Sequence, residues 1–171
     1  MKYFTPEKYL RLQARDTSAM DAADTDWEGA VADYERHLES IRPKLTESIR
    51  CLLDDYSLHD AEVFFMGRTG DNLVIALRLK TPPRNFLVLT YMLLETPNVM
   101  ATNWPGENLS SRALWLVDEI DLGVNMQPSY GQSILFSNGW QVQLTFRDVE
   151  IVSVQAMLPE PVFRAERLAG V

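Results

Sequence analysis

The stretch of sequence that decides the fold is residues 27–80, WEGAVADYERHLESIRPKLTESIRCLLDDYSLHDAEVFFMGRTGDNLVIALRLK. In its first half, from Trp27 to Tyr56, apolar residues recur at steps of three or four positions, which predicts one face of an α-helix. In its second half, from Leu73 to Leu79, leucine or isoleucine stands at every second position, which predicts a β-strand. The change of period near residue 58 therefore predicts a helical part followed by a sheet.

Pro43 lies inside the helical stretch. A proline there removes a hydrogen bond and clashes with the preceding turn, so we expect a kink or a junction of two helices between Ser40 and Pro43. Upstream, Thr5 followed by Pro6 and an acid predicts the start of a short first helix. Thr25, with Glu28 three residues later, predicts the start of the next helix after a loop at residues 16–26.

After residue 60 the pattern predicts strands. Residues 86–94 are apolar on both faces, as in a strand covered by helices. Asn138-Gly139 is typical of a type I′ turn, after which Trp140 is expected to face the core. Further strands are expected at 62–68, 73–80, 112–121 and 149–157. We therefore expect an α+β fold in a single domain of residues 1–171. Helices fall within 1–57, an antiparallel sheet of about six to eight strands packs face to face with them within 60–157, and a tail occupies 158–171.

The composition narrows the class of partner. The chain has 16 Lys and Arg against 24 Asp and Glu, a formal net charge of −8. This balance argues against nucleic-acid binding and favours a protein partner with a basic surface. The start of the chain lacks a signal-peptide pattern and the apolar run at 86–94 is too short to cross a bilayer, so we expect the cytoplasm and no membrane partner. We expect no cofactor, and the sequence leaves the oligomeric state open.

His59 and Asp60 are the candidate catalytic pair, because they lie at the junction between the helical part and the sheet. A histidine held beside a carboxylate can transfer protons. The interpretation we favour is structural, with both side chains bonded to backbone groups at the junction, because neighbouring residues in a strand point to opposite faces. With two histidines in the chain, a multi-histidine metal site is excluded, and we expect no metal.

Two further features are candidates for binding. Asp118, Glu119 and Asp121 lie in the strand expected at 112–121, where such charges are typical of a solvated or edge strand. Asp118 shares a face with Ile120, while Glu119 and Asp121 share the other. Trp104, in a loop with proline and glycine, is either a binding anchor or a cap on an open sheet edge.

Four segments resemble a bacterial family of unknown function: MKYFTPEKY, YSLHDAEV, WLVDEIDL and ILFSNGWQVQLTFRDVEI. Members of that family open with Met-(Lys/Arg)-Tyr-Phe-Thr and carry a Leu-His-Asp junction. The resemblance implies the same fold and the bacterial cytoplasm, and it implies no reaction. The family pattern places a polar residue, often histidine, before the ILFS-like strand, whereas this chain has Gly131-Gln132 there.

Three hypotheses of function follow. The preferred one is a non-enzymatic protein-binding domain. By analogy, small acidic cytoplasmic α+β proteins of this kind are sometimes immunity proteins against secreted toxins. The alternative is a small hydrolase or metal-assisted enzyme that uses His59 and Asp60 with Asp118 or Glu119. The third is a small-ligand module closed by the Trp104 loop. An enzyme requires these side chains to converge in one concave pocket.

Overall fold

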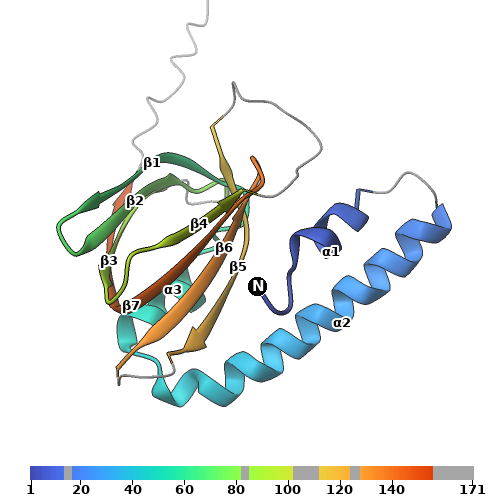
Figure 1. Cartoon of the computed structure of the whole chain (residues 1–171), viewed down its shortest axis with the longest axis horizontal. Coiled ribbons are helices and arrows are strands. Elements are labelled where there is room, and N and C mark those ends of the chain that lie inside the picture. Colours follow the sequence, from blue (N-terminus) through green and yellow to red (C-terminus); the bar gives the residue numbers. More distant parts are fainter. Residues whose placement is uncertain (14–16, 82–84, 102–111, 124–127, 156–171) are drawn as a thin grey trace, which may run out of the picture.

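The computed structural model describes residues 1–13, 17–81, 85–101, 112–123 and 128–155 (Figure 1). Within these ranges three α-helices come first, α1 (Pro6–Arg11), α2 (Thr17–Ile41) and α3 (Glu47–Asp55), with a 3₁₀ helix, η1 (Arg42–Lys44), before α3. Seven strands follow: β1 (Ala61–Thr69), β2 (Asn72–Arg78), β3 (Asn85–Leu93), β4 (Asn98–Ala101), β5 (Leu114–Leu122), β6 (Tyr130–Phe136) and β7 (Trp140–Gln155). All their pairings are antiparallel. The predicted α+β fold, with helices first and an antiparallel sheet after them, is confirmed.

The sheet closes on itself. Its strand order is β3-β2-β1-β5-β6-β7-β4, and β3 also pairs with β7, so six strands form a ring. The long strand β7 makes this possible, because its first half pairs with β6 and β4 and its second half with β3. The separate strand expected at 149–157 is therefore the second half of β7. None of the described helices is long and apolar enough to cross a membrane.

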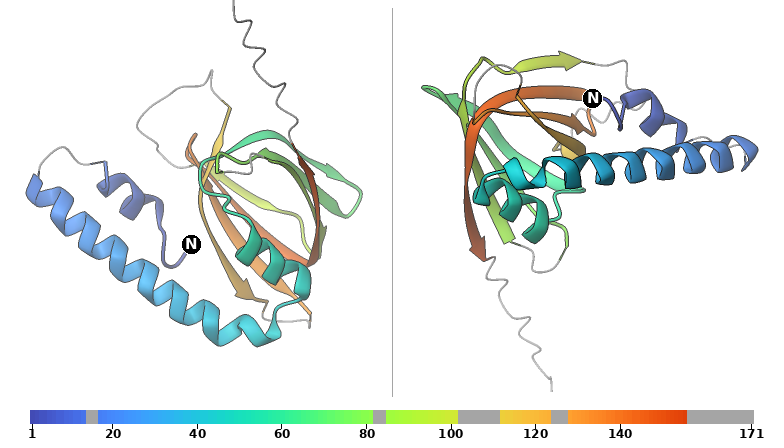
Figure 2. Two further views of the ribbon diagram at one scale, coloured as in Figure 1. Left: turned by 180° about the vertical axis from the view of Figure 1, so that it is seen from behind. Right: turned by 90° about the horizontal axis from the view of Figure 1, so that it is seen from below.

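The core lies inside this closed sheet, which differs from the expected face-to-face packing. Leu45, which follows η1, and Ile49 and Leu52 of α3 join the buried side chains of the strands in one hydrophobic cluster. Figures 1 and 2 show α3 at one end of the closed sheet and α2 along its outside, with α1 and the first half of α2 projecting beyond it. Helix α3 thus contributes to the core, whereas the outer face of α2 carries exposed side chains.

Pro43 ends α2 as predicted. The α-helix stops at Ile41, η1 contains the proline, and α3 begins at Glu47 after Thr46. The start of α2 was predicted wrongly, because residues 17–26 are helical instead of forming a loop. Thr25 lies within the helix and donates its hydroxyl to Asp21 O. The segment contains three alanines, which have the highest helix propensity, and this outweighs the capping pattern at Thr25.

Three expectations about the strands need correction. Gly139 has φ 79°, but Asn138 is not among the described residues with positive φ, so the turn is not type I′. Trp140 is 45% exposed instead of facing the core. Phe86 and Met92 of β3 are also exposed, so none of the described helices covers that strand's outer face. The strand β4 was missed because its four residues, beside Pro97, give too short a pattern.

Candidate functional site

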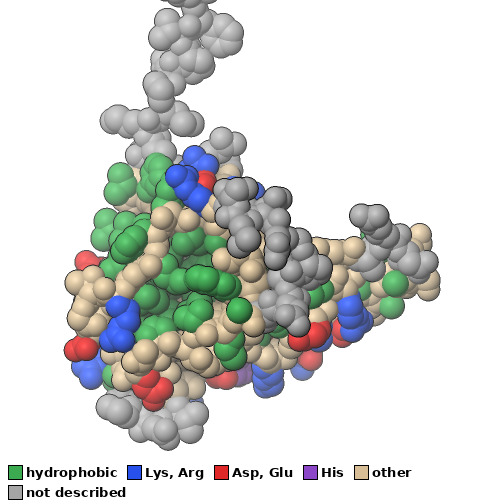
Figure 3. Space-filling model, turned by 45° about the horizontal axis from the view of Figure 1, so that its top comes forward, with side chains coloured by type: hydrophobic (Ala, Val, Ile, Leu, Met, Phe, Trp, Pro, Cys, Tyr) green, Lys and Arg blue, Asp and Glu red, His purple; other side chains and the backbone are tan. Residues whose placement is uncertain are grey.

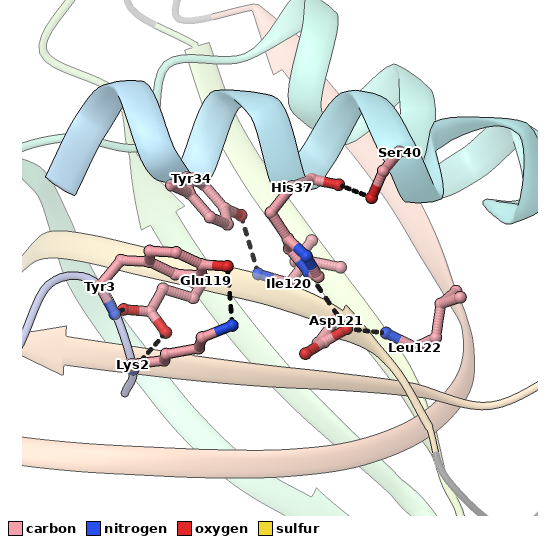
Figure 4. Close-up of polar contacts among 9 residues, drawn as sticks. All are labelled: Lys2, Tyr3, Tyr34, His37, Ser40, Glu119, Ile120, Asp121 and Leu122. Atoms are coloured by element: carbon pink, nitrogen blue, oxygen red, sulfur yellow. Dashed lines mark hydrogen bonds and ion pairs between the residues drawn. The ribbon is translucent and has the colours of Figure 1, made fainter. Parts of the chain in front are cut away.

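The three acidic residues of β5 point to two sides of the strand, as alternation predicted. Asp118 and Ile120 pair with the buried residues Ile134 and Gln132 of β6, while Glu119 and Asp121 face the N-terminal segment and α2 (Figure 4). Strand β6 pairs along β5, whereas β1 pairs only with Leu114 and Trp115, so from Leu116 onward the other side of β5 has no strand partner among the described residues. The three acids therefore do lie at an edge, but the edge is not fully solvated, because each carboxylate has a partner within the protein.

Glu119 binds the start of the chain. Its carboxylate accepts the backbone N–H groups of Lys2 (2.7 Å), Tyr3 (2.7 Å) and Phe4 (2.6 Å), and Glu119 is 8% exposed. The ring of Phe4 in turn packs against Trp27 and Tyr34 of α2. Glu119 thus holds the N-terminal segment between β5 and α2. Both oxygens of this carboxylate already accept hydrogen bonds from the chain itself, so the carboxylate is not available to a partner protein.

Asp121 is more exposed but also has contacts within the chain. Its Oδ1 lies 3.2 Å from His37 Nε2 and accepts the N–H of Leu122 (Figure 4). Beside it, the backbone N–H of Ile120 donates to the hydroxyl of Tyr34 at 2.8 Å. Burial raises the pKa of Tyr34, so this hydroxyl remains neutral. The contacts of Tyr34 and His37 join α2 to the side of β5 that no strand covers.

Asp118 is bonded inside the closed sheet. Its carboxyl group accepts Trp115 Nε1–H (2.9 Å) and Gln132 Nε2–H (2.7 Å), and both of these partners are fully buried. Burial raises the pKa of Asp118, against the opposing effect of the two hydrogen bonds. The Oε1 atom of Gln132 and the hydroxyl of Tyr91 are buried and make no hydrogen bond with any described residue. A protonated Asp118 would supply a donor to this group of side chains.

His59 and Asp60 do not form a catalytic pair in this geometry. His59 Nδ1 donates to Leu116 O at 2.6 Å, which fixes the proton on that nitrogen, while its Nε2 is 4.0 Å from Asp60. Asp60 adopts φ 62°, and its backbone N–H donates to Trp115 O. Both residues therefore bond to the backbone of β5. Asp118 and Glu119 are engaged elsewhere, so the four residues of the enzyme hypothesis do not converge.

We expect His59→Ala to lower the free energy of unfolding by about 1 kcal/mol, because it removes a single, partly exposed hydrogen bond to Leu116 O. The melting temperature should fall by roughly 2–4 °C. His59→Gln, whose side chain keeps an N–H donor, is the control and should recover part of the loss. Melting unchanged in His59→Ala would contradict a structural role.

Trp104 lies outside the described residues, so the proposed binding role of its loop stays a prediction. Among the described residues, no group of three or more His, Cys, Asp or Glu side chains is placed to hold a metal ion.

The structure reveals an acidic stripe on α2 that sequence reasoning missed. Five exposed acids recur at helical spacing along its outer face: Asp21, Asp24, Glu28, Glu35 and Glu39. The buried residues Ala23, Ala30 and Ile41 lie on the other side of the helix. Glu39 pairs with Arg42, and no described residue forms an ion pair with the other four. The stripe is visible in the sequence only once the helix is extended back to Thr17, because the first two acids fall in the segment predicted as a loop.

The second feature that the sequence did not reveal is an apolar trough between β1 and the strands β4, β6 and β7. It consists of two adjoining hollows of about 200 and 220 Å³ that share Met66 of β1. Figure 3 shows hydrophobic side chains gathered in a hollow on this face. The side chains of the trough are mainly apolar, among them Val63, Phe65, Met66, Leu73, Val99, Phe136, Trp140 and Val142. Neither hollow contains His59, Asp60, Asp118 or Glu119.

Comparisons with known proteins add no constraint on function. No protein-family model matches this chain, and no curated protein matches it either. The likeness of the opening segment and the Leu-His-Asp junction to a bacterial family therefore stays a resemblance.

Proposed function

We propose that this protein is a non-enzymatic binding domain of the bacterial cytoplasm whose acidic stripe on α2 binds a protein with a basic surface. The observation that carries the proposal is the stripe itself. Its acids extend over 19 residues of a helix, a rise of about 27 Å, and four of them make no ion pair with a described residue. Such a row of one charge attracts a basic surface and speeds its association.

The arrangement of the molecule supports this surface over the three acids of β5. Those acids are engaged within the chain, so a partner could bind them only by displacing Phe4, His37 or Trp115 from its contact. On the outer face of α2, four of the five acids form no ion pair with a described residue, and the first half of the helix projects from the closed sheet (Figure 2). The binding site that the sequence placed at Asp118, Glu119 and Asp121 is therefore moved to α2. An immunity-type role, in which a small acidic protein covers a basic toxin surface, is one form of this proposal.

The proposal is tested by capture from a lysate of the bacterium that encodes the protein. The test variant is Asp24→Lys/Glu28→Lys/Glu35→Lys. The matched control is Asp71→Lys/Glu95→Lys/Glu150→Lys, which makes the same change in net charge with exposed acids away from α2. A specific partner should be captured by the wild type and by the control, and lost with the test variant. Equal capture by both variants would refute the assignment to α2.

A further inference from the structure

The apolar trough has one charged group beside it that lacks a charged partner. Arg68 of β1 contributes to the hollow formed with Met66, Leu73 and Val142. Its Nη1 donates to Thr96 Oγ1 and its Nη2 to Gly70 O, both at the long distance of 3.3 Å. Neither acceptor carries a charge, and no described carboxylate lies within ion-pair distance of Arg68.

The other arginines near β1 differ from Arg68 in this respect. Arg78 and Arg112 both pair with Glu62, and this pairing lowers the pKa of Glu62. Asp71, at the same turn as Arg68, contributes to a different hollow, together with Arg147. In a chain of net charge −8, an arginine that remains without a carboxylate at the end of an apolar trough is suited to bind an anion.

The shape of the trough indicates what kind of anion. The two hollows lie end to end along β1, one on each side of Met66, and Arg68 contributes only to the second. From Arg68 to Val63 the strand extends about 17 Å. The combined volume of the two hollows falls within the range of small-ligand pockets, about 300–1,000 Å³. The trough can therefore hold an unbranched apolar chain along its length while the anionic end of that chain remains at Arg68.

We propose that the trough binds a free medium-chain fatty acid, with its carboxylate on the guanidinium of Arg68 and its chain along β1 toward Phe136 and Trp140. Charge complementarity selects the carboxylate, and the lining of Met66, Leu73, Val99 and Val142 removes the chain from water. This site is separate from the acidic stripe on α2, so the proposal is independent of the protein-binding function.

The test uses decanoate, below the concentration at which it forms micelles, and uncharged decanol as the matched ligand. Binding is measured by calorimetry and by tryptophan fluorescence, with Trp140→Phe to identify the fluorescence that reports on the trough. Arg68→Gln should weaken decanoate binding about tenfold, the loss expected for one charge-assisted contact at a partly exposed site. The same variant should leave decanol binding unchanged. Arg50→Gln, which replaces an exposed arginine of α3, is the control and should change neither.

A second variant tests the chain-binding part of the trough. Met66→Glu places a charge where the two hollows meet and should abolish the binding of both decanoate and decanol, while melting confirms that the fold is retained. The proposal is overturned if decanoate does not bind at millimolar concentration, or if Arg68→Gln and Arg50→Gln bind it equally well. Sedimentation that shows a dimer in the wild type and a monomer in Met66→Glu would also overturn it, because a second copy of the chain would then cover the trough.

Discussion

Replacing Glu119 with alanine is expected to lower the free energy of unfolding by about 4 kcal/mol. The carboxylate accepts three successive backbone N–H groups, of Lys2, Tyr3 and Phe4, in a site where Glu119 is nearly buried. Alanine leaves these donors without an acceptor, and water can reach them only if the segment leaves β5. The ring of Phe4 would then lose its packing on Trp27.

Thermal and urea denaturation measure this effect, and a loss of this size corresponds to a fall in melting temperature of roughly 8–16 °C. Asp121→Ala is the control, because Asp121 is exposed and its contact with His37 is worth little in water. The control should lose less than about 1 kcal/mol. If the two variants lost the same small amount, Glu119 would not hold the N-terminal segment.

The second large effect is a pH dependence of stability that comes from Asp118. Burial raises the pKa of this carboxyl group in the folded protein. Its contribution to stability is therefore fully present below the pKa of the unfolded chain, near 3.9, and is lost as the pH rises through the folded pKa. At pH values above both of these pKa values, each unit by which folding raises the pKa costs about 1.4 kcal/mol of stability.

Asp118→Asn isolates this contribution, because asparagine has nearly the same shape and does not titrate. The stability of the variant relative to the wild type should increase as the pH rises from the unfolded pKa of Asp118 through its folded pKa. Urea unfolding at a series of pH values measures this difference. Other carboxylates act in the opposite direction: hydrogen bonds from Arg42 and Arg112 lower the pKa values of Asp54 and Glu62. Their effect is the same in the wild type and in Asp118→Asn, so it cancels in the difference between the two free energies of unfolding. A difference that does not vary with pH would contradict a raised pKa.

The sequence predicted those parts of the fold that depend on local pattern. The helix break at Pro43 follows from a missing N–H, and the order of helices and strands follows from the change of period. The closure of the sheet could not be predicted in this way, because it depends on β3 pairing with the second half of β7, about 60 residues later. The start of α2 was missed because a capping pattern at Thr25 was given more weight than the propensity of the alanines before it.

The same distinction applies to the candidate sites. Alternation placed Asp118 and Glu119 on opposite faces of β5 correctly. A local pattern cannot show what each face of the strand contacts. Glu119 binds Lys2, Tyr3 and Phe4, which stand 115 to 117 positions earlier in the chain. Asp118 binds Gln132 on the next strand. The trough was missed because Trp140 follows the alternation of core residues, yet it is 45% exposed and lines the hollow beside β1.

The measurement that tests the proposed function most directly is the association rate constant with the partner that capture identifies, at two salt concentrations. We expect Asp24→Lys/Glu28→Lys/Glu35→Lys to lower this rate constant at least tenfold at low salt. Added salt should lower the rate of the wild type toward that of the variant. The control Asp71→Lys/Glu95→Lys/Glu150→Lys should keep most of the wild-type rate. An association rate constant that changes neither with salt nor with the charges on α2 would contradict the proposal that the acidic stripe binds the partner.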